Sequence, residues 1–219
     1  MKWPTVTLGG HIHVLSGFAF KSDLFSNQKN GLPLIRIRDV VRGKSNTYYL
    51  GDYNDEYVVK NGDLLIGMDG DFNREMWKGD KALLNQRVCK ITADSVTLNQ
   101  EYLYYFLPKE LQKIHAVTPV VTVKHLSVKG IKNIQIPLPP IEIQKKTAQV
   151  LETADQLRKD CQQVEQELNT LAQSVFLEMF GDPVTNKKGW KTKLFSEVGQ
   201  LDRGISKHRP RNQHILKKG

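Results

Sequence analysis

The sequence lacks the features that mark secreted and membrane proteins. It has only two cysteines, Cys89 and Cys161, and no apolar run approaches the ~18–20 residues that a membrane span needs. The opening Met1-Lys2-Trp3-Pro4 does not resemble a signal peptide. We therefore expect a cytoplasmic protein with no membrane partner and with two reduced thiols.

Signatures of catalysis are also scarce. The sequence has no Gly-x-x-x-x-Gly-Lys-Ser/Thr phosphate loop and no glycine-rich fingerprint for a dinucleotide or a methyl donor. His11 and His13 share one predicted strand face, but no Cys or second His pair accompanies them. We expect no metal and no cofactor in this chain.

One acidic stretch leaves an enzymatic alternative open. Clustered carboxylates can hold Mg²⁺ for a nuclease, although acidic residues after a turn are usually solvated turn formers. The candidate ligands are Asp63, Asp69, Asp71 and Glu75, and Lys78 lies close to them in the sequence. A stand-alone Mg²⁺ nuclease built on Asp69 and Asp71 therefore remains an alternative.

A strict heptad pattern runs through one long segment, residues 140–181. Apolar or small residues follow one another at alternating spacings of four and three, which predicts a helix supercoiled against a partner helix. Pro139-Pro140 precede the segment and Gly181-Asp182-Pro183 follow it, as expected at helix ends. From Ile143 to Val175, a rise of ~1.5 Å per residue gives a rod on the order of 50 Å long. The seam consists of Val150, Ala154, Leu157, Cys161, Val164, Leu168, Leu171 and Val175.

The segment after this helix resembles the start of the chain. Trp190-Lys191-Thr192 and a glycine fourteen residues after the tryptophan, Gly204, match Trp3-Pro4-Thr5 and Gly17. A second copy of a repeat would begin at this place. We therefore interpret residues 182–219 as the start of a truncated second domain that ends in a loose basic tail.

Charge is unevenly distributed over the chain, whose net charge is +9. Residues 140–180 are acidic, whereas residues 1–139 and 181–219 are basic. A basic surplus is compatible with a polyanion partner, but an ordinary basic protein would show it equally well.

Residues 1–139 predict short strands, turns and one helix. Leu34 to Arg38 alternates as a half-buried strand with Arg36 and Arg38 on its exposed face, which suits either a DNA-facing surface or an edge strand blunted by charge. Asn61-Gly62 lies between two apolar runs, 57–59 and 64–66, and predicts a hairpin.

The rest of this domain predicts a helix and a final strand. Asn99 is a candidate N-cap for a helix that we expect to be interrupted at Pro108. Ile134-Gln135-Ile136 predicts a strand, after which Pro137 to Pro140 stiffens the exit into the long helix.

Together these elements resemble the specificity (S) subunit of type I restriction-modification systems. The most specific match is a proline-rich strand exit that feeds a coiled-coil helix. The matching segments are Trp-x-x-x-x-Leu from Trp3; Ser16-Gly17-x-x-Phe20-Lys21-Ser22; Pro33-Leu34-Ile35-Arg36-Ile37-Arg38-Asp39-Val40; Asn61-Gly62-Asp63-Leu64-Leu65-Ile66; and Ile136-Pro137-Leu138-Pro139-Pro140-x-Glu142-Ile143-Gln144.

The resemblance implies an α+β fold: a mixed target-recognition domain with short twisted strands in residues 1–139, then a long coiled-coil helix and a basic tail. The family's S subunit has two recognition domains, each followed by a helix, and the helices pair antiparallel. This chain, with one domain and one helix, would be a half-subunit that pairs with a second copy and reads a symmetric bipartite target.

The resemblance also implies the partners. The chain would bind double-stranded DNA, a methyltransferase subunit that modifies adenine with S-adenosylmethionine, and a restriction subunit; S-adenosylmethionine, ATP and Mg²⁺ would belong to those subunits. This chain would not be an enzyme. The alternative is an interaction protein or decoy that binds the methyltransferase or another S subunit without reading DNA.

Candidate DNA-facing residues are predicted from residue type and loop position. Arginine and lysine suit guanine edges and phosphates, and asparagine and glutamine suit adenine edges. The candidates are Lys21, Arg36, Arg38, Arg42, Lys44, Asn46, Asn73, Arg74, Asn85, Gln86, Arg87 and Lys124.

Overall fold

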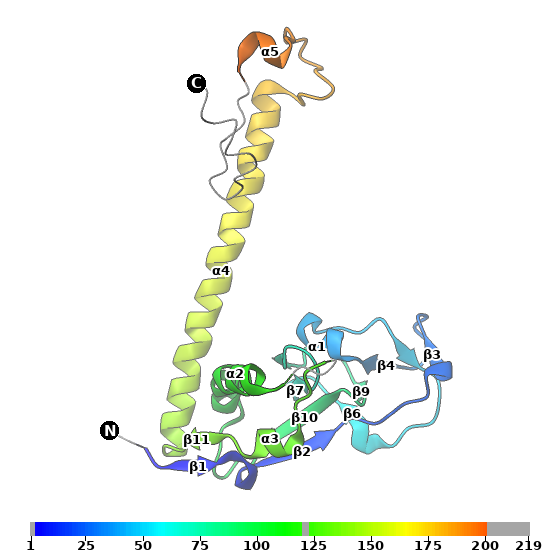
Figure 1. The fold of residues 1–219 in the computed structure, drawn as a ribbon, viewed down its shortest axis with the longest axis vertical. Coiled ribbons are helices and arrows are strands. Elements are labelled where there is room, and N and C mark those ends of the chain that lie inside the picture. Colours follow the sequence, from blue (N-terminus) through cyan, green and yellow to red (C-terminus); the bar gives the residue numbers. More distant parts are fainter. Residues whose placement is uncertain (1–2, 120–122, 201–219) are drawn as a thin grey trace, which may run out of the picture. The chain divides into compact units, whose positions relative to one another are not determined.

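A computed structural model describes residues 3–119 and 123–200 (Figure 1). The chain divides into two compact units, Met1–Lys159 and Asp160–Gly219, and the division falls inside one continuous helix. The helices are α1 (Ile37–Arg42), α2 (Gln100–Val117), α3 (Val128–Lys132), α4 (Ile141–Phe180) and α5 (Phe195–Val198), with short 3₁₀ turns at Leu8–Gly10, Ser22–Leu24 and Asp55–Tyr57.

The strands of the first unit form three sheets in the described residues. Neighbouring strands pair antiparallel, except for the parallel pair β4–β9. One sheet pairs β1 (Thr5–Thr7) with β11 (Gln135–Pro137). The four-stranded sheet has the order β2 (Ile12–Ser16), β10 (Val88–Ala93), β7 (Leu64–Gly67), β8 (Arg74–Met76), and the five-stranded sheet has the order β3 (Phe25–Ser26), β5 (Tyr48–Tyr49), β4 (Leu32–Ile35), β9 (Ala82–Leu84), β6 (Val58–Val59).

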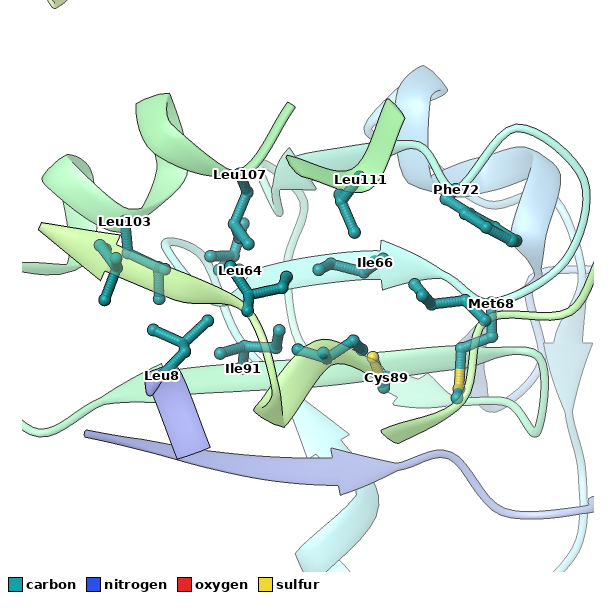
Figure 2. Close-up of a cluster of buried hydrophobic side chains, with 14 of the residues drawn as sticks. Leu8, Leu64, Ile66, Met68, Phe72, Cys89, Ile91, Leu103, Leu107 and Leu111 are labelled. Carbon is teal, nitrogen blue, oxygen red and sulfur yellow. The ribbon is translucent and has the colours of Figure 1, made fainter. Parts of the chain in front are cut away.

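Strand β7 lies at the centre of the core, and all four of its residues are buried. Successive side chains of a strand point to opposite faces. Leu64 and Ile66 therefore join the main cluster beneath α2, and Leu65 joins a second cluster with residues of the five-stranded sheet. In Figure 2 the labelled leucines of α2 lie over Leu64 and Ile66; they are Leu103, Leu107 and Leu111.

Helix α2 begins as predicted. The Asn99 side chain accepts the backbone N–H of Tyr102 at 2.8 Å, which satisfies one of the free donors at the helix start. The predicted interruption at Pro108 was wrong, since the helix continues to Val117. Pro108 is exposed, so water can reach the carbonyl that it leaves unpaired, and the leucines on the opposite face hold the helix to the core.

The predicted hairpin around Asn61-Gly62 was also wrong. The turn forms, with Gly62 at φ +87°, where glycine is favoured. The flanking strands, however, do not pair with each other: β6 pairs with β9 in one sheet, and β7 pairs with β10 and β8 in another. The turn therefore carries the chain from the five-stranded to the four-stranded sheet.

The strand predicted from Leu34 to Arg38 ends early. Strand β4 stops at Ile35, and α1 begins at Ile37, so Arg36 and Arg38 do not share a strand face. The buried Asp39 carboxylate accepts the Arg36 backbone N–H at 3.0 Å, and Gly43 ends the helix at φ +65°. These start and stop signals overrode the apolar alternation.

The predicted long helix is present as α4, and it ends before Gly181, whose φ is +78°. All eight seam residues are exposed in the described chain. The buried positions of the helix are Gln144 and Ala148, near its start. The first unit therefore buries α4 at positions other than the seam, although Ala154 of the seam lines an open cavity with Tyr104 and Tyr105 of α2.

In the second unit, the segment after α4 folds back on the end of the helix. The Trp190 indole N–H donates to the Phe180 carbonyl at 2.7 Å, and Asn186 exchanges two hydrogen bonds with the Trp190 backbone, each of 2.8 Å. The predicted basic tail and Gly204 lie in residues 201–219, outside the described residues.

The mixed strands and helices confirm the α+β fold class with a long helix. None of the helices in the described ranges is long and apolar enough to cross a membrane.

Candidate nucleic-acid interface

Four predicted residues converge on one open, polar pocket. Arg36 comes from the start of α1, and Asn85, Gln86 and Arg87 form the turn between β9 and β10. The cavity measures about 420 Å³ and is completed by Phe20, Ser22, Phe25 and Ile37. Lys21, also predicted, is exposed between two of these lining residues. We call this site the Arg36 pocket.

A close backbone approach fixes the turn that lines this pocket. The Gly17 N–H donates to the Val88 carbonyl and the Phe18 N–H to the Leu84 carbonyl, both at 2.9 Å. A Cβ added at Gly17 would lie 2.1 Å from the Asn85 carbonyl oxygen, so only glycine fits. Gly17, which belongs to the predicted repeat, therefore helps to position the Asn85 turn.

Arg87 reaches the pocket from an ion-paired position. Its Nε lies 3.3 Å from Asp69 Oδ2, while 64% of its side chain is exposed, so other guanidinium N–H groups face solvent. The opposite oxygen, Asp69 Oδ1, lies 2.7 Å from His125 Nδ1. Asp69 is thus held between two basic side chains.

The residues of the nuclease alternative do not form a metal site. Within the described residues, no group of three or more His, Cys, Asp and Glu side chains is arranged to hold a metal ion. Asp63 pairs with Lys90 at 3.7 Å and Glu75 accepts the Tyr104 hydroxyl at 2.9 Å, so these carboxylates face other partners.

Of the two histidines considered as metal ligands, His11 has a partner within the fold: its Nδ1 lies 2.8 Å from the Thr97 hydroxyl.

Two other candidates have partners within the fold. The half-buried Lys124 donates to the His115 carbonyl at 2.6 Å, in the last turn of α2, where a cation is favourable. The Arg74 guanidinium lies 3.6 Å from the Tyr104 ring centroid, a cation–π contact. Burial raises the pKa of Tyr104 to about 12, against the opposing charge of Arg74.

The remaining candidates lie outside the Arg36 pocket. Their side chains are exposed, as direct contact with DNA requires, and Asn73 lines a separate cavity together with Arg74. Arg38 and Arg42 are on α1, Lys44 and Asn46 are in the loop that follows, and Asn73 precedes β8.

Sequence reasoning missed two groups. Phe20, Ser22 and Phe25 line the pocket, and the motif around Lys21 was the signal that could have placed them there. Gln144 is fully buried, although it lies near the start of a helix whose seam is exposed. The signal that could have identified Gln144 was its place at the end of the proline-rich motif, where it is a polar side chain.

The pocket contains two kinds of hydrogen-bonding group, the guanidinium groups of arginine and the side-chain amides of asparagine and glutamine. Guanidinium groups match guanine O6 and N7 or phosphate oxygens, whereas side-chain amides match adenine N6 and N7. The pocket offers both types within one opening, together with aromatic walls.

Residues 1–170 match the family model of the type I restriction modification DNA specificity domain. The chain belongs to this family. It is 43% identical to the type I restriction enzyme EcoBI specificity subunit of Escherichia coli. The alignment of 178 residues covers 80% of this chain and 38% of that protein. It is 28% identical, over 202 residues, to the MjaVIII specificity subunit of Methanocaldococcus jannaschii, covering 91% and 46%.

Solved structures support the same fold for this family member. The HsdS subunit from Thermoanaerobacter tengcongensis has a TM-score of 0.60 at 20% identity, covering 82% of this chain and 45% of that one. The S subunit from M. genitalium has a TM-score of 0.57 at 14% identity, covering 86% and 48%. The chain spans less than half the length of the curated relatives it matches.

Proposed function

We propose that this chain is a DNA-reading half-subunit of a type I restriction-modification complex, which directs adenine methylation and restriction by partner subunits. The observation that carries the proposal is the convergence of Arg36, Asn85, Gln86 and Arg87 on one open polar pocket. Membership of the specificity-domain family supports the same reading.

In this account, the Arg36 pocket reads base edges, and the exposed cations around it bind phosphates. Base contacts set the sequence preference, whereas phosphate contacts position the domain and make binding weaken as salt rises. Arg36 and Arg87 are the candidates for guanine, and Asn85 and Gln86 are the candidates for adenine.

The second part of the proposal is a homodimer through α4. A helix with eight exposed seam residues needs a partner helix, since Leu157 is 60% exposed and Val150 is 69% exposed. A second copy supplies that partner and makes an isologous interface. Two identical domains then read a symmetric bipartite target with an unread spacer.

The chemistry belongs to other subunits in this proposal. A methyltransferase subunit flips the target adenine and methylates it with S-adenosylmethionine, and a restriction subunit uses ATP and Mg²⁺ to cut unmodified DNA. This chain recognises the DNA sequence and sets the spacing between the two half-sites. The proposal places it in the cytoplasm, with DNA and those subunits.

Purified chain tests both parts. Competition binding at moderate salt, against a library of duplexes, should select one bipartite palindromic sequence, and light scattering should give twice the mass of one chain. Equal affinity for all sequences would contradict the reading role and favour the decoy. Sequence-selective binding by a monomer would contradict the homodimer alone.

A further inference from the structure

Three segments that are distant in the sequence are joined by backbone hydrogen bonds close to Arg87. They are the residues just after β7, the residues just before β10 and the segment before α3. The Met68 N–H donates to the Arg87 carbonyl at 2.9 Å, and the Met68 carbonyl accepts the Leu126 N–H at 2.7 Å. The Gly70 N–H donates to another carbonyl of the segment before α3, at 3.0 Å. The backbone of Asp69 is therefore fixed on both sides.

The Asp69 carboxylate gives one oxygen to each of two basic side chains. Oδ2 lies 3.3 Å from Arg87 Nε, and Oδ1 lies 2.7 Å from His125 Nδ1. An arginine that pairs with a carboxylate often uses two N–H groups and both oxygens. Here His125 occupies the second oxygen, so Arg87 keeps its terminal amino groups for another acceptor, and 64% of its side chain is exposed.

These ion pairs add little to the stability of the fold. Ion pairs between exposed side chains contribute little because water screens them, and the Arg87 and His125 side chains are 64% and 65% exposed. The backbone hydrogen bonds already join the three segments. The Asp69 side chain is only 17% exposed, so a firmly held carboxylate lies at the base of an arginine that reaches outward into the Arg36 pocket.

We propose that Asp69 is a positioning residue for Arg87, and that it holds this arginine in the orientation that reads guanine. The inference rests on the proposed DNA-reading function. An unrestrained arginine side chain loses rotational freedom when it binds a base. The ion pair restricts Arg87 before DNA binds, so less entropy is lost on binding. It also leaves the edge formed by the two terminal amino groups for DNA, and that edge matches O6 and N7 of guanine.

The charge of Asp69 has a second effect, which makes the positioning role measurable. A carboxylate close to DNA repels the phosphates, whatever the base sequence. Asp69 therefore opposes binding to every duplex through its charge, and favours the preferred duplex through Arg87. A residue with a merely structural role would act differently, because a destabilised domain loses affinity for every duplex.

Asp69→Asn tests this role with a side chain of nearly the same size. The variant should bind the duplex selected by the wild-type chain about tenfold more weakly, and unrelated duplexes as tightly as wild type or more tightly. The readout is the ratio of the two dissociation constants at one fixed salt concentration. The thermal unfolding midpoint should stay nearly unchanged, since the lost ion pairs are to exposed side chains.

Arg87→Ala tests whether Asp69 acts through Arg87. In the Arg87→Ala background, Asp69→Asn should cause no further loss of discrimination, because the side chain that Asp69 positions is gone. Replacement of single guanines in the selected duplex by 7-deazaguanine, which lacks the N7 acceptor, gives a second readout. One such replacement should weaken binding by wild type and have little effect on either single variant.

Asp71→Asn is the matched control for charge. Asp71 lies in the same loop as Asp69, is exposed, and lines a different cavity with Asn73 and Gln112. Removal of its charge should change the affinity for preferred and unrelated duplexes by the same factor, because a change in phosphate repulsion does not depend on sequence.

The outcomes separate this inference from the proposed function. A wild-type chain that binds all duplexes equally would overturn the DNA-reading function, and the positioning role with it. If wild type and Asp69→Asn discriminate equally well, only the positioning role is overturned. The same holds if Asp69→Asn weakens all duplexes equally, if it still reduces discrimination in the Arg87→Ala background, or if Asp71→Asn has the same effect.

Discussion

The Gln144 side-chain oxygen accepts the backbone N–H of Asn99 at 2.9 Å, which links the start of α4 to the start of α2 across 45 residues. The same side chain donates to the Thr97 carbonyl at 3.0 Å and to the Pro139 carbonyl at 2.8 Å. One buried amide therefore satisfies three backbone groups. This contact fixes where the long helix leaves the recognition domain.

Gln144→Leu should lower the free energy of unfolding by about 2–4 kcal/mol, because it leaves three backbone groups without partners, one of them buried and two part-buried. Urea unfolding measures the change. Gln149→Leu, at an exposed position of the same helix, should change stability by less than about 0.5 kcal/mol. Equal effects of the two variants would contradict the role given to Gln144.

Gly17→Ala should destabilise the chain by about 2 kcal/mol or more, since the new Cβ would lie 2.1 Å from the Asn85 backbone oxygen. Gly10→Ala is the control, because no atom lies within 4 Å of its added Cβ. Thermal unfolding of both variants checks the prediction, and a neutral Gly17→Ala would show that the close approach is not required.

Arg36→Ala should weaken binding to the preferred DNA by about 1–3 kcal/mol and reduce discrimination between sequences. Lys113→Ala should have little effect, since Lys113 pairs with Glu110 on α2 at 2.7 Å, outside the Arg36 pocket. Titrations on preferred and unrelated duplexes separate the effects. If Arg36→Ala weakened both equally, Arg36 would be a phosphate contact rather than a base reader.

The two thiols should react differently with a thiol reagent at pH 8. Burial raises the pKa of Cys89 to about 12, so it stays protonated and shielded in the folded chain. Cys161 is exposed and should react rapidly in dilute protein, then more slowly as the concentration rises and the dimer covers it. Cys161→Ser should remove the fast phase, and a rate independent of concentration would contradict the buried seam.

Inserting one heptad between Gln162 and Gln163 should lengthen the spacer of the preferred site by about 3 base pairs. Seven residues add ~10 Å of helix, and B-DNA rises 3.4 Å per base pair. The inserted residues keep the period, so the seam stays in phase. Selection of DNA by the variant measures the spacer, and an unchanged spacer would show that α4 does not set it.

Local chemistry made part of the fold predictable. The Asn99 cap, the strand at Gln135 and the helix from Ile141 to Phe180 each carry signals in neighbouring residues, and each formed as expected. The strand predicted through Arg38 failed because an acidic residue, Asp39, three positions after Arg36, starts a helix there.

Tertiary packing made the rest unpredictable. Asn61-Gly62 gives a turn, but whether its strands pair depends on distant partners, since Val59 pairs with Ala82 and Leu64 with Met76. The Arg36 pocket likewise joins residues from three segments that are separated in the sequence. Residue type alone made Arg36, Arg87 and Lys124 candidates. Only the fold shows that Arg36 and Arg87 line the same pocket, whereas Lys124 bonds to a carbonyl of α2.

The central claim is that this chain directs methylation at a symmetric bipartite site. Adenine methylation across the host genome, compared with the gene present and deleted, tests it most directly. The account predicts loss of methylation at one palindromic bipartite motif, restored by the wild-type gene but not by Arg36→Ala. An unchanged methylation pattern after deletion would contradict it.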